Sequence, residues 1–250
     1  YNVFTMTDRI LDIGSAGLES SDQRVRKLMD NVVNSSVPGY RKSEAVVRAF
    51  PTELEAATQR ISSMKPQVEG TFYSHIQGAL IKTDGKFDLA LGSDGYFVLG
   101  GPWGEGYTRD GRFRLDKDGR LISVAGNYPV MGLGGPVIVP QGADVMVTQS
   151  GVIMADGVEV DRLRVVNPEV KNSLTSLNGS IFQLRDSYAT MQEIDNPRII
   201  QGYIEASNVD IVDQMMEMIY LQRIYAVNTK VIQSRDAGLA RAMELGRPSQ

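Results

Sequence analysis

The chain has 250 residues, and its 30 acidic residues outnumber its 26 lysines and arginines, which gives a net charge of −4. A nucleic-acid-binding domain normally carries an excess of basic residues, so nucleic acid is not an expected partner. The absence of cysteine excludes disulfides, zinc–thiolate sites and cysteine nucleophiles. No apolar stretch approaches the roughly 18 residues that a membrane-spanning helix needs, so we expect no membrane insertion.

The first predicted element is an amphipathic helix from about residue 7 to about residue 34, followed by an extended linker. Gly14 and Gly17 each weaken it by about 1 kcal/mol relative to alanine, so it needs a packing partner. Pro38 and Gly39 favour a turn after its end. Its apolar stripe consists of Leu11, Leu18, Val25, Leu28 and Val32.

From about residue 70 to residue 187 the sequence consists of short apolar runs separated by glycine-containing turns, which predicts a central antiparallel all-β domain. Glycine follows aspartate at Gly95, Gly111 and Gly119, where a hairpin turn favours positive φ. We expect strands at 87–91, 96–99, 112–115, 120–124 and 136–139, with further strands at 145–147, 152–154 and 163–166.

The last predicted element is a helix from about residue 209 to residue 245, which follows a polar linker that begins at residue 188. Ser207 or Asn208 is expected to cap its first turn, because either side chain can accept hydrogen bonds from backbone amides. Its apolar residues follow a coiled-coil-like spacing, and a second apolar set widens the stripe beyond one seam. The first set is Ile211, Met215, Met218, Leu221, Tyr225, Ile232, Leu239 and Ala242; the second is Met216, Ile219, Val227 and Val231.

These elements predict an α+β protein with three parts: a helix and linker at 1–69, a β-rich domain at 70–187, and a linker and long helix at 188–250. We expect the two terminal helices to pair in a coiled-coil-like bundle. The apolar surface that remains is then available for contacts between copies, and head-to-tail contacts that do not close produce a filament. The alternative is that both helices pack on their own β-domain.

No catalytic constellation is present, so we expect no enzymatic activity, no cofactor and no metal site. His75 is the single histidine and is expected on the surface. The segment 116–119 resembles a calcium loop but lacks its later glutamate, so a β-turn is the simpler prediction. The glycine-rich segment 100–106 lacks the lysine of a phosphate-binding loop and is expected to be a flexible loop carrying Trp103.

Three regions of the sequence resemble, in the same order, signatures of flagellar rod and hook proteins. The first is Asp30–Arg41, which departs from the family pattern at Asp30 and Val33. The second is a hairpin signature that begins at Phe87–Val98 and continues through Tyr107–Phe113. The third runs from Gln201 to Val209 and continues into the last helix as Met218-Ile219, Gln222-Arg223, Tyr225 and Asn228.

The resemblance implies a structural subunit of the flagellar basal-body rod that polymerises head-to-tail into the axial drive shaft and transmits torque. It implies copies of the same chain and other rod and hook proteins as partners, and a location in the basal body within the periplasmic space. The resemblance also implies export through the flagellar type III apparatus, and the lack of an apolar signal-peptide core after Tyr1 is in line with this expectation. We favour a proximal rod protein over a distal rod or short hook-like protein. A secreted β-rich glycan-binding module or enzyme is the alternative from another class.

The expected subunit-interface residues lie in the two helices and in the turns beside them. Asn228 is a polar residue within the apolar seam and is expected to fix helix register, and Gln222 and Arg223 are expected either to bridge to a neighbour or to stay in solvent. The full set is Leu18, Val25, Asn31, Asn34, Pro38, Gly39, Tyr40, Ser207, Asn208, Met218, Leu221, Gln222, Arg223, Tyr225, Asn228 and Ile232.

Overall fold

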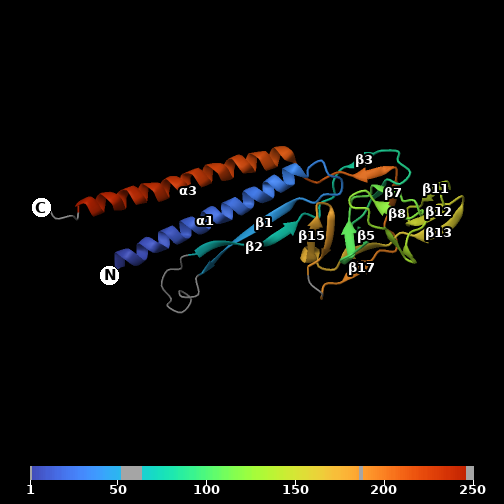
Figure 1. Cartoon of the computed structure of the whole chain (residues 1–250), viewed down its shortest axis with the longest axis horizontal. Coiled ribbons are helices and arrows are strands. Elements are labelled where there is room, and N and C mark those ends of the chain that lie inside the picture. The colour runs from blue at the N-terminus through green and yellow to red at the C-terminus, as the bar shows by residue number, and fades with distance from the viewer. Residues whose placement is uncertain (1, 52–63, 186–187, 246–250) are drawn as a thin grey trace. The chain divides into compact units, whose positions relative to one another are not determined.

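The computed structural model describes residues 2–51, 64–185 and 188–245 (Figure 1). The chain combines two long α-helices with mainly short, antiparallel strands, which confirms the predicted mixture of helix and antiparallel sheet. It forms two compact units. The helical unit comprises Tyr1–Val32, Ser43–Phe72 and Ile211–Gln250, and the β-rich unit comprises Val33–Lys42 and Tyr73–Asp210.

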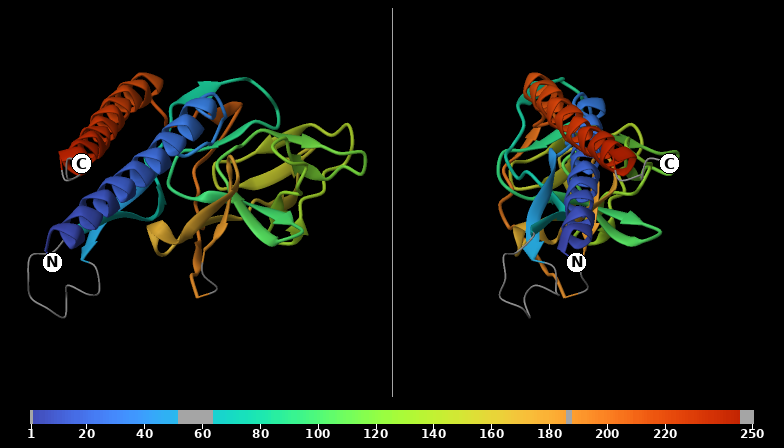
Figure 2. Two further views of the ribbon diagram at one scale, coloured as in Figure 1. Left: turned by 60° about the vertical axis from the view of Figure 1, so that its left-hand side comes forward. Right: turned by 90° about the vertical axis from the view of Figure 1, so that its left-hand side faces the viewer.

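The helical unit contains α1 (Asn2–Val33), α3 (Ile211–Leu245) and a two-stranded sheet of β1 (Ser43–Pro51) and β2 (Met64–Tyr73). In Figures 1 and 2, β1 lies alongside α1. Strands β1 and β2 occupy much of the segment that was predicted as an extended linker after the first helix. The prediction missed them because no short turn like Asp-Gly joins the two runs in sequence.

The β-rich unit is built around a six-stranded antiparallel sheet with the order β15-β16-β6-β5-β14-β17. At its centre, Phe97 of β5 pairs with Thr108 of β6, and Tyr107 of β6 pairs with Phe182 of β16. The strands are β5 (Tyr96–Gly101), β6 (Gly104–Thr108), β14 (Val165–Pro168), β15 (Leu174–Asn178), β16 (Ile181–Leu184) and β17 (Met191–Glu193).

Shorter strands form further small antiparallel sheets in the described part of this unit. A 3-10 turn, η1 (Lys171–Ser173), precedes β15. The strands are β3 (Leu80–Lys82), β4 (Leu89–Leu91), β7 (Phe113–Leu115), β8 (Leu121–Ser123), β9 (Met131–Gly132), β10 (Gly135–Pro136), β11 (Val145–Val147), β12 (Val152–Ala155), β13 (Val158–Arg162), β18 (Ile199–Gln201) and β19 (Tyr203–Glu205).

Strand β5 is buried on both faces, because alternate side chains of a strand point to opposite sides of the sheet. Phe97 and Leu99 belong to the larger hydrophobic core, and Tyr96 and Val98 belong to a second, smaller one. Both cores lie within the β-rich unit. This double burial explains why Tyr96–Leu99 is a continuous apolar run rather than an alternating one.

Two details of the predicted turns need correction. Gly95 and Gly119 have φ of +135° and +77°, as the turn prediction requires, but Gly111 does not have positive φ. A Cβ at Gly111 would lie 1.5 Å from the carbonyl oxygen of Leu89, so glycine is needed there for close approach of two backbones. The expected flexible loop at 100–106 is instead the tight β5–β6 hairpin. Its Trp103 ring packs edge-on against the Tyr128 ring, with the ring centroids 4.5 Å apart.

Candidate functional site

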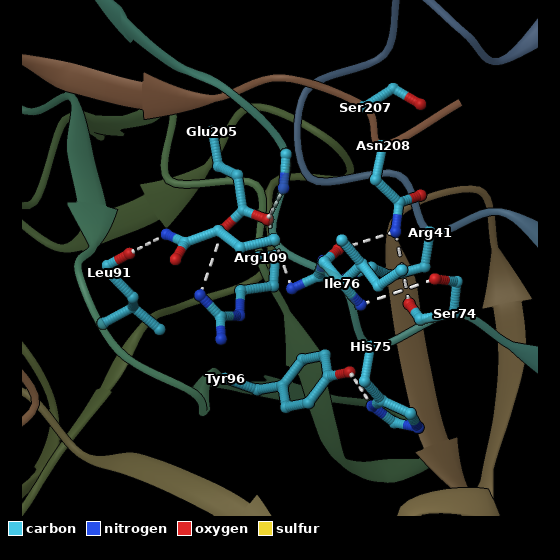
Figure 3. Close-up of polar contacts among 12 residues, drawn as sticks. Arg41, Ser74, His75, Ile76, Leu91, Tyr96, Arg109, Glu205, Ser207 and Asn208 are labelled. Carbon is cyan, nitrogen blue, oxygen red and sulfur yellow. Dashed lines mark hydrogen bonds and ion pairs between the residues drawn. The ribbon is translucent and has the colours of Figure 1, made fainter. Parts of the chain in front are cut away.

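The three regions that carry the family resemblance meet within the β-rich unit at the side chain of Glu205 (Figure 3). Arg41 comes from the turn that follows α1 in the chain, Arg109 follows β6, and Glu205 ends β19 shortly before α3 begins. Segments that are far apart in the sequence therefore form one polar cluster. We call Arg41, Arg109 and Glu205 the junction cluster.

The junction cluster is a buried ion triad. Nη2 of Arg41 lies 3.2 Å from Oε1 of Glu205, and Nη1 of Arg109 lies 3.0 Å from Oε2. All three side chains are at most 2% exposed. The backbone amide of Gly78 donates a hydrogen bond to Oε1 of Glu205 at 3.0 Å. One carboxylate therefore neutralises two guanidinium groups only in part, and the triad retains one excess positive charge.

Arg109 makes two further contacts that fix its guanidinium. Nη2 donates to the carbonyl oxygen of Ser93 at 2.8 Å, and the guanidinium carbon lies 5.6 Å from the centroid of the Tyr96 ring. Burial lowers the pKa of Arg109, although the Glu205 carboxylate acts in the opposite direction. Burial likewise raises the pKa of Tyr96, so the phenol stays protonated at neutral pH.

The turn at Pro38–Tyr40 is attached to the same cluster through its backbone. The amide of Gly39 donates to the carbonyl oxygen of Glu205 at 2.8 Å, and Tyr40 is only 6% exposed. Gly39 has φ of +69°, and a Cβ there would lie 2.2 Å from the amide nitrogen of Asp110. Glycine is therefore required at this position both for the turn and for the close approach of the arginine-bearing segment.

Asn208 does not cap the last helix, which corrects the prediction. Its side-chain oxygen accepts a hydrogen bond from the amide of Lys42 at 2.7 Å, and its Nδ2 donates to the carbonyl oxygens of Ser74 and Ile76 at 3.3 and 2.7 Å. Ser207 accepts from the amide of Val209 at 3.2 Å, and α3 begins only at Ile211. Asn208 is thus a cross-link between chain segments, which local sequence could not indicate.

A second polar network, in the helical unit, centres on Asn31. Its Nδ2 donates to the carbonyl oxygen of Ser43 and to Oε1 of Gln214, each at 2.8 Å. Its Oδ1 accepts from the amide and hydroxyl of Ser43 at 2.9 and 3.1 Å. Asn31 and Gln214 are 0% and 1% exposed. One side chain therefore links α1 to the start of β1 and to the first turns of α3.

Asn31→Ala is expected to lower the free energy of unfolding of the helical unit by about 1–3 kcal/mol, because it leaves the buried Ser43 and Gln214 groups without these hydrogen bonds. Denaturant unfolding followed by the helical circular dichroism signal measures the change. Gln23→Ala, at an exposed position of α1, is the matched control and is expected to have little effect. Equal stability of both variants would contradict the proposed importance of the network.

The other expected interface residues fall into three groups by burial. Leu221 is 1% exposed. Gln222, Arg223 and Tyr225 are exposed. Partly buried residues are Leu18, Val25, Asn34, Pro38, Ser207, Met218, Asn228 and Ile232. Whether these residues contact another subunit remains a prediction.

The structure brings some of these side chains together within the helical unit. Val25 of α1 and Gln222 and Tyr225 of α3 line a pocket of about 220 Å³, together with Ser21 and Asp22. Asn228 lies near Gly17, since its Nδ2 is 3.9 Å from the position that a Cβ of this glycine would occupy. Elsewhere, Arg24 of α1 pairs with Glu217 of α3 at 3.0 Å. Across these contacts, residue numbers increase along α1 as they decrease along α3, so the two helices are antiparallel.

Sequence reasoning missed Arg109, Glu205 and Gln214 as site residues. Arg109 has the oppositely charged Asp110 beside it in Tyr107–Gly111, Glu205 is the one charged residue of Tyr203–Asn208, and no local feature marks Gln214. Charged side chains are mostly exposed unless they are paired, so the charges of Arg109 and Glu205 did not by themselves indicate burial. Among the described residues, no group of three or more His, Asp or Glu side chains could hold a metal ion, and no helix is long and apolar enough to cross a membrane.

Two family models match regions of the chain that contain Arg109 and Glu205. Residues 200–245 match the family model described as flagellar basal body rod FlgEFG protein C-terminal, and residues 90–155 match the flagellar hook protein FlgE/F/G D1 domain. The chain is 32% identical over 249 residues to the flagellar basal-body rod protein FlgF of Escherichia coli K12, covering 93% of this chain and 95% of the relative.

The similarity to two further relatives also extends over 93% of this chain. FlgF of Salmonella typhimurium is 31% identical over 249 residues, covering 93% of this chain and 95% of its own length. The flagellar basal-body rod protein FlgG of Buchnera aphidicola from Schizaphis graminum is 27% identical over 263 residues, covering 93% and 98%. The matches do not separate FlgF from FlgG. With nearly full-length identity above 30% to two such proteins, the chain belongs to the flagellar basal-body rod protein family.

Proposed function

We propose that this chain is a structural subunit of the bacterial flagellar basal-body rod, which polymerises head-to-tail into the axial shaft that transmits torque. The observation that carries the proposal is the apolar surface of α3, which lies in the region that matches the C-terminal family model. Among its described residues, nine large apolar side chains are each at least 45% exposed. They are Ile211, Val212, Met215, Met216, Ile219, Tyr220, Tyr225, Val227 and Val231.

So much exposed apolar area along one helix is unfavourable in water and is typical of an assembly surface. The occupant that we propose is the corresponding helical region of further copies and of other rod and hook proteins. Contacts of this kind that do not close into a ring generate a filament. Of the expected interface residues, Gln222, Arg223 and Tyr225 are exposed on α3 and belong to this surface, whereas Asn31 and Leu221 are buried within the subunit.

We also propose that α1 and α3 pair in a coiled-coil-like bundle within the subunit. The Arg24–Glu217 ion pair and the Asn31–Gln214 hydrogen bond support this arrangement. The ion pair is partly exposed and contributes at most about 1 kcal/mol, so the buried amide pair specifies the alignment of the helices more strongly. The three-part division at residues 69/70 and 187/188 remains part of this proposal.

The remaining features of the proposal follow from family membership. The subunit acts in the basal body within the periplasmic space, reaches it through the flagellar type III export apparatus, and has no catalytic role. The assignment to a proximal rather than a distal rod position stays open between FlgF-like and FlgG-like relatives. The comparisons do not favour the alternative of a secreted glycan-binding module or enzyme.

The experiment that tests assembly replaces Ile219 by aspartate. Because Ile219 is 50% exposed, the monomer is expected to keep its stability, whereas a charge in the contact between copies is expected to prevent incorporation into rods and to abolish motility. The matched control is Val158→Asp on β13, a position that is 67% exposed in the β-rich unit.

Rod incorporation is measured by isolating basal bodies from cells that express each variant, and motility by swimming in soft agar. Incorporation and motility are expected to fail for Ile219→Asp and to persist for Val158→Asp. Wild-type incorporation of Ile219→Asp would overturn the assignment of this α3 surface to assembly.

A further inference from the structure

His75 lies in a segment without regular structure, residues 74–79, that the junction cluster and Asn208 hold in place (Figure 3). The amide of Ser74 donates to the carbonyl oxygen of Lys42 at 2.8 Å. The carbonyl oxygen of Ile76 accepts from Nη1 of Arg41 and, at 2.7 Å, from Nδ2 of Asn208. The backbone on both sides of His75 is therefore attached to the cluster.

The imidazole ring is half-buried, and its surroundings suit the neutral form. Nδ1 lies 3.4 Å from the hydroxyl oxygen of Tyr96, which is 2% exposed. Because that phenol stays protonated, it can donate to an unprotonated Nδ1. Nε2 is buried, and a hydrogen bond between the ring and the Lys171 backbone favours the protonated form, against the larger effect of burial.

The charged groups around the ring do not favour a second proton. The ring faces Arg41 from the turn after α1 and Lys171 from η1, with Asp94 from the β4–β5 connection as the opposing acidic group. The Glu205 carboxylate is already shared by two arginines. The pKa of His75 is lowered from its ordinary 6.5 mainly by burial and also by Arg41 and Lys171, while the Lys171 backbone and Asp94 act in the opposite direction.

We propose that His75 makes the attachment of residues 74–78 to the junction cluster sensitive to pH, and that protonation of its ring releases this segment. The added charge is placed against Arg41 in a cluster that already carries excess positive charge. Ring protonation would favour the state in which the ring reaches water, and this state breaks the hydrogen bonds at Ile76 and Gly78. The inference concerns the subunit itself and does not depend on rod assembly.

The direction of the pH effect follows from the lowered pKa. The stability that the neutral ring contributes is fully present above about pH 6.5, the value in the unfolded chain, and is lost as the pH falls through the lower value of the folded state. At low pH the equilibrium constant for opening of the segment is about tenfold larger for each pH unit by which the pKa of His75 is lowered. Carboxylates titrate mostly below this window.

The first test is an NMR titration of the full-length protein between about pH 8 and about pH 5, the range in which an imidazole changes charge. The chain has a single histidine, so its one imidazole signal needs no assignment by mutagenesis. We expect a midpoint below that of a histidine in the unfolded chain, together with faster hydrogen exchange at the Gly78 amide as the pH falls, after correction for intrinsic exchange. A midpoint at or above the unfolded value would overturn the proposal.

The second test is His75→Gln, which keeps a polar side chain but cannot gain a proton. The variant is expected to lose the pH dependence of Gly78 protection, while exposed amides respond as in the wild type. The wild-type titration decides the question even if the variant folds poorly. The same pH-dependent loss of protection in folded His75→Gln would show that another group is responsible and would overturn the proposal.

Discussion

Glu205→Ala is expected to lower the free energy of unfolding of the β-rich unit by about 3–5 kcal/mol, the typical effect of removing one partner of a buried ion pair. The variant leaves Arg41 and Arg109 buried beside each other without their shared carboxylate. It also removes the acceptor of the Gly78 amide. Because burial disfavours an uncompensated guanidinium, the segments that carry these arginines are expected to separate.

The unfolding of this unit can be followed by fluorescence, since Trp103 is the single tryptophan and packs against Tyr128. Glu193→Ala is the matched control: Glu193 pairs with Arg164 at 2.8 Å, but its side chain is 55% exposed, so we expect a loss below about 1 kcal/mol. Glu205→Gln removes the charge at nearly constant side-chain volume. Its loss in free energy of unfolding is expected to lie between those of Glu205→Ala and Glu193→Ala. A Glu205→Ala variant as stable as the control would contradict the role given to the triad.

Leu221→Asp is expected to disrupt the helical unit of the free subunit and also to abolish rod incorporation and motility. Leu221 is 1% exposed, so a carboxylate there is buried without a partner, which costs several kcal/mol. The helical circular dichroism signal is expected to decrease, whereas Trp103 fluorescence reports an intact β-rich unit, because the hydrophobic cores of that unit consist of other segments.

Ile219→Asp, two residues away on the same helix, is the comparison that separates folding from assembly. Ile219 is 50% exposed, so we expect this variant to keep the helical signal of the free subunit while it fails to assemble. Ile232→Asp, at a partly buried position, is expected to give an intermediate loss of helical signal. A Leu221→Asp variant with full helical signal and normal motility would show that neither the packing of α3 nor its assembly depends on this residue.

The junction cluster has a mechanical consequence if the proposed function holds. Arg41 and Asn208 lie in the two chain segments that lead from α1 and into α3, and both are fixed within the β-rich unit by polar contacts. In a subunit that transmits torque, these polar contacts would resist the displacement of the two segments from the β-rich unit under load. Glu205→Gln would then be expected to affect motility under high load more strongly than motility under low load.

The sequence by itself determined the class of the elements and most of their positions. The helical spacing from Leu11 to Val32 predicted α1, the apolar seam from Ile211 predicted α3, and the short runs between glycine turns predicted the antiparallel strands. These features depend on local periodicity and on turn chemistry, which a single segment contains completely. The resemblance to rod and hook proteins was likewise carried by local motifs, and the comparisons confirmed it.

Only the tertiary structure decided what the motif residues do. Asn208 has the side chain of a helix cap, but Lys42, Ser74 and Ile76 supply its partners, and these lie far away in the chain. Gly111 looks like a turn glycine, yet the backbone of Leu89 is what requires it. Burial of Glu205 between two arginines depends on three segments meeting. A hydrogen bond or ion pair across such separations has no local signal, because its energy exists only after the chain has folded.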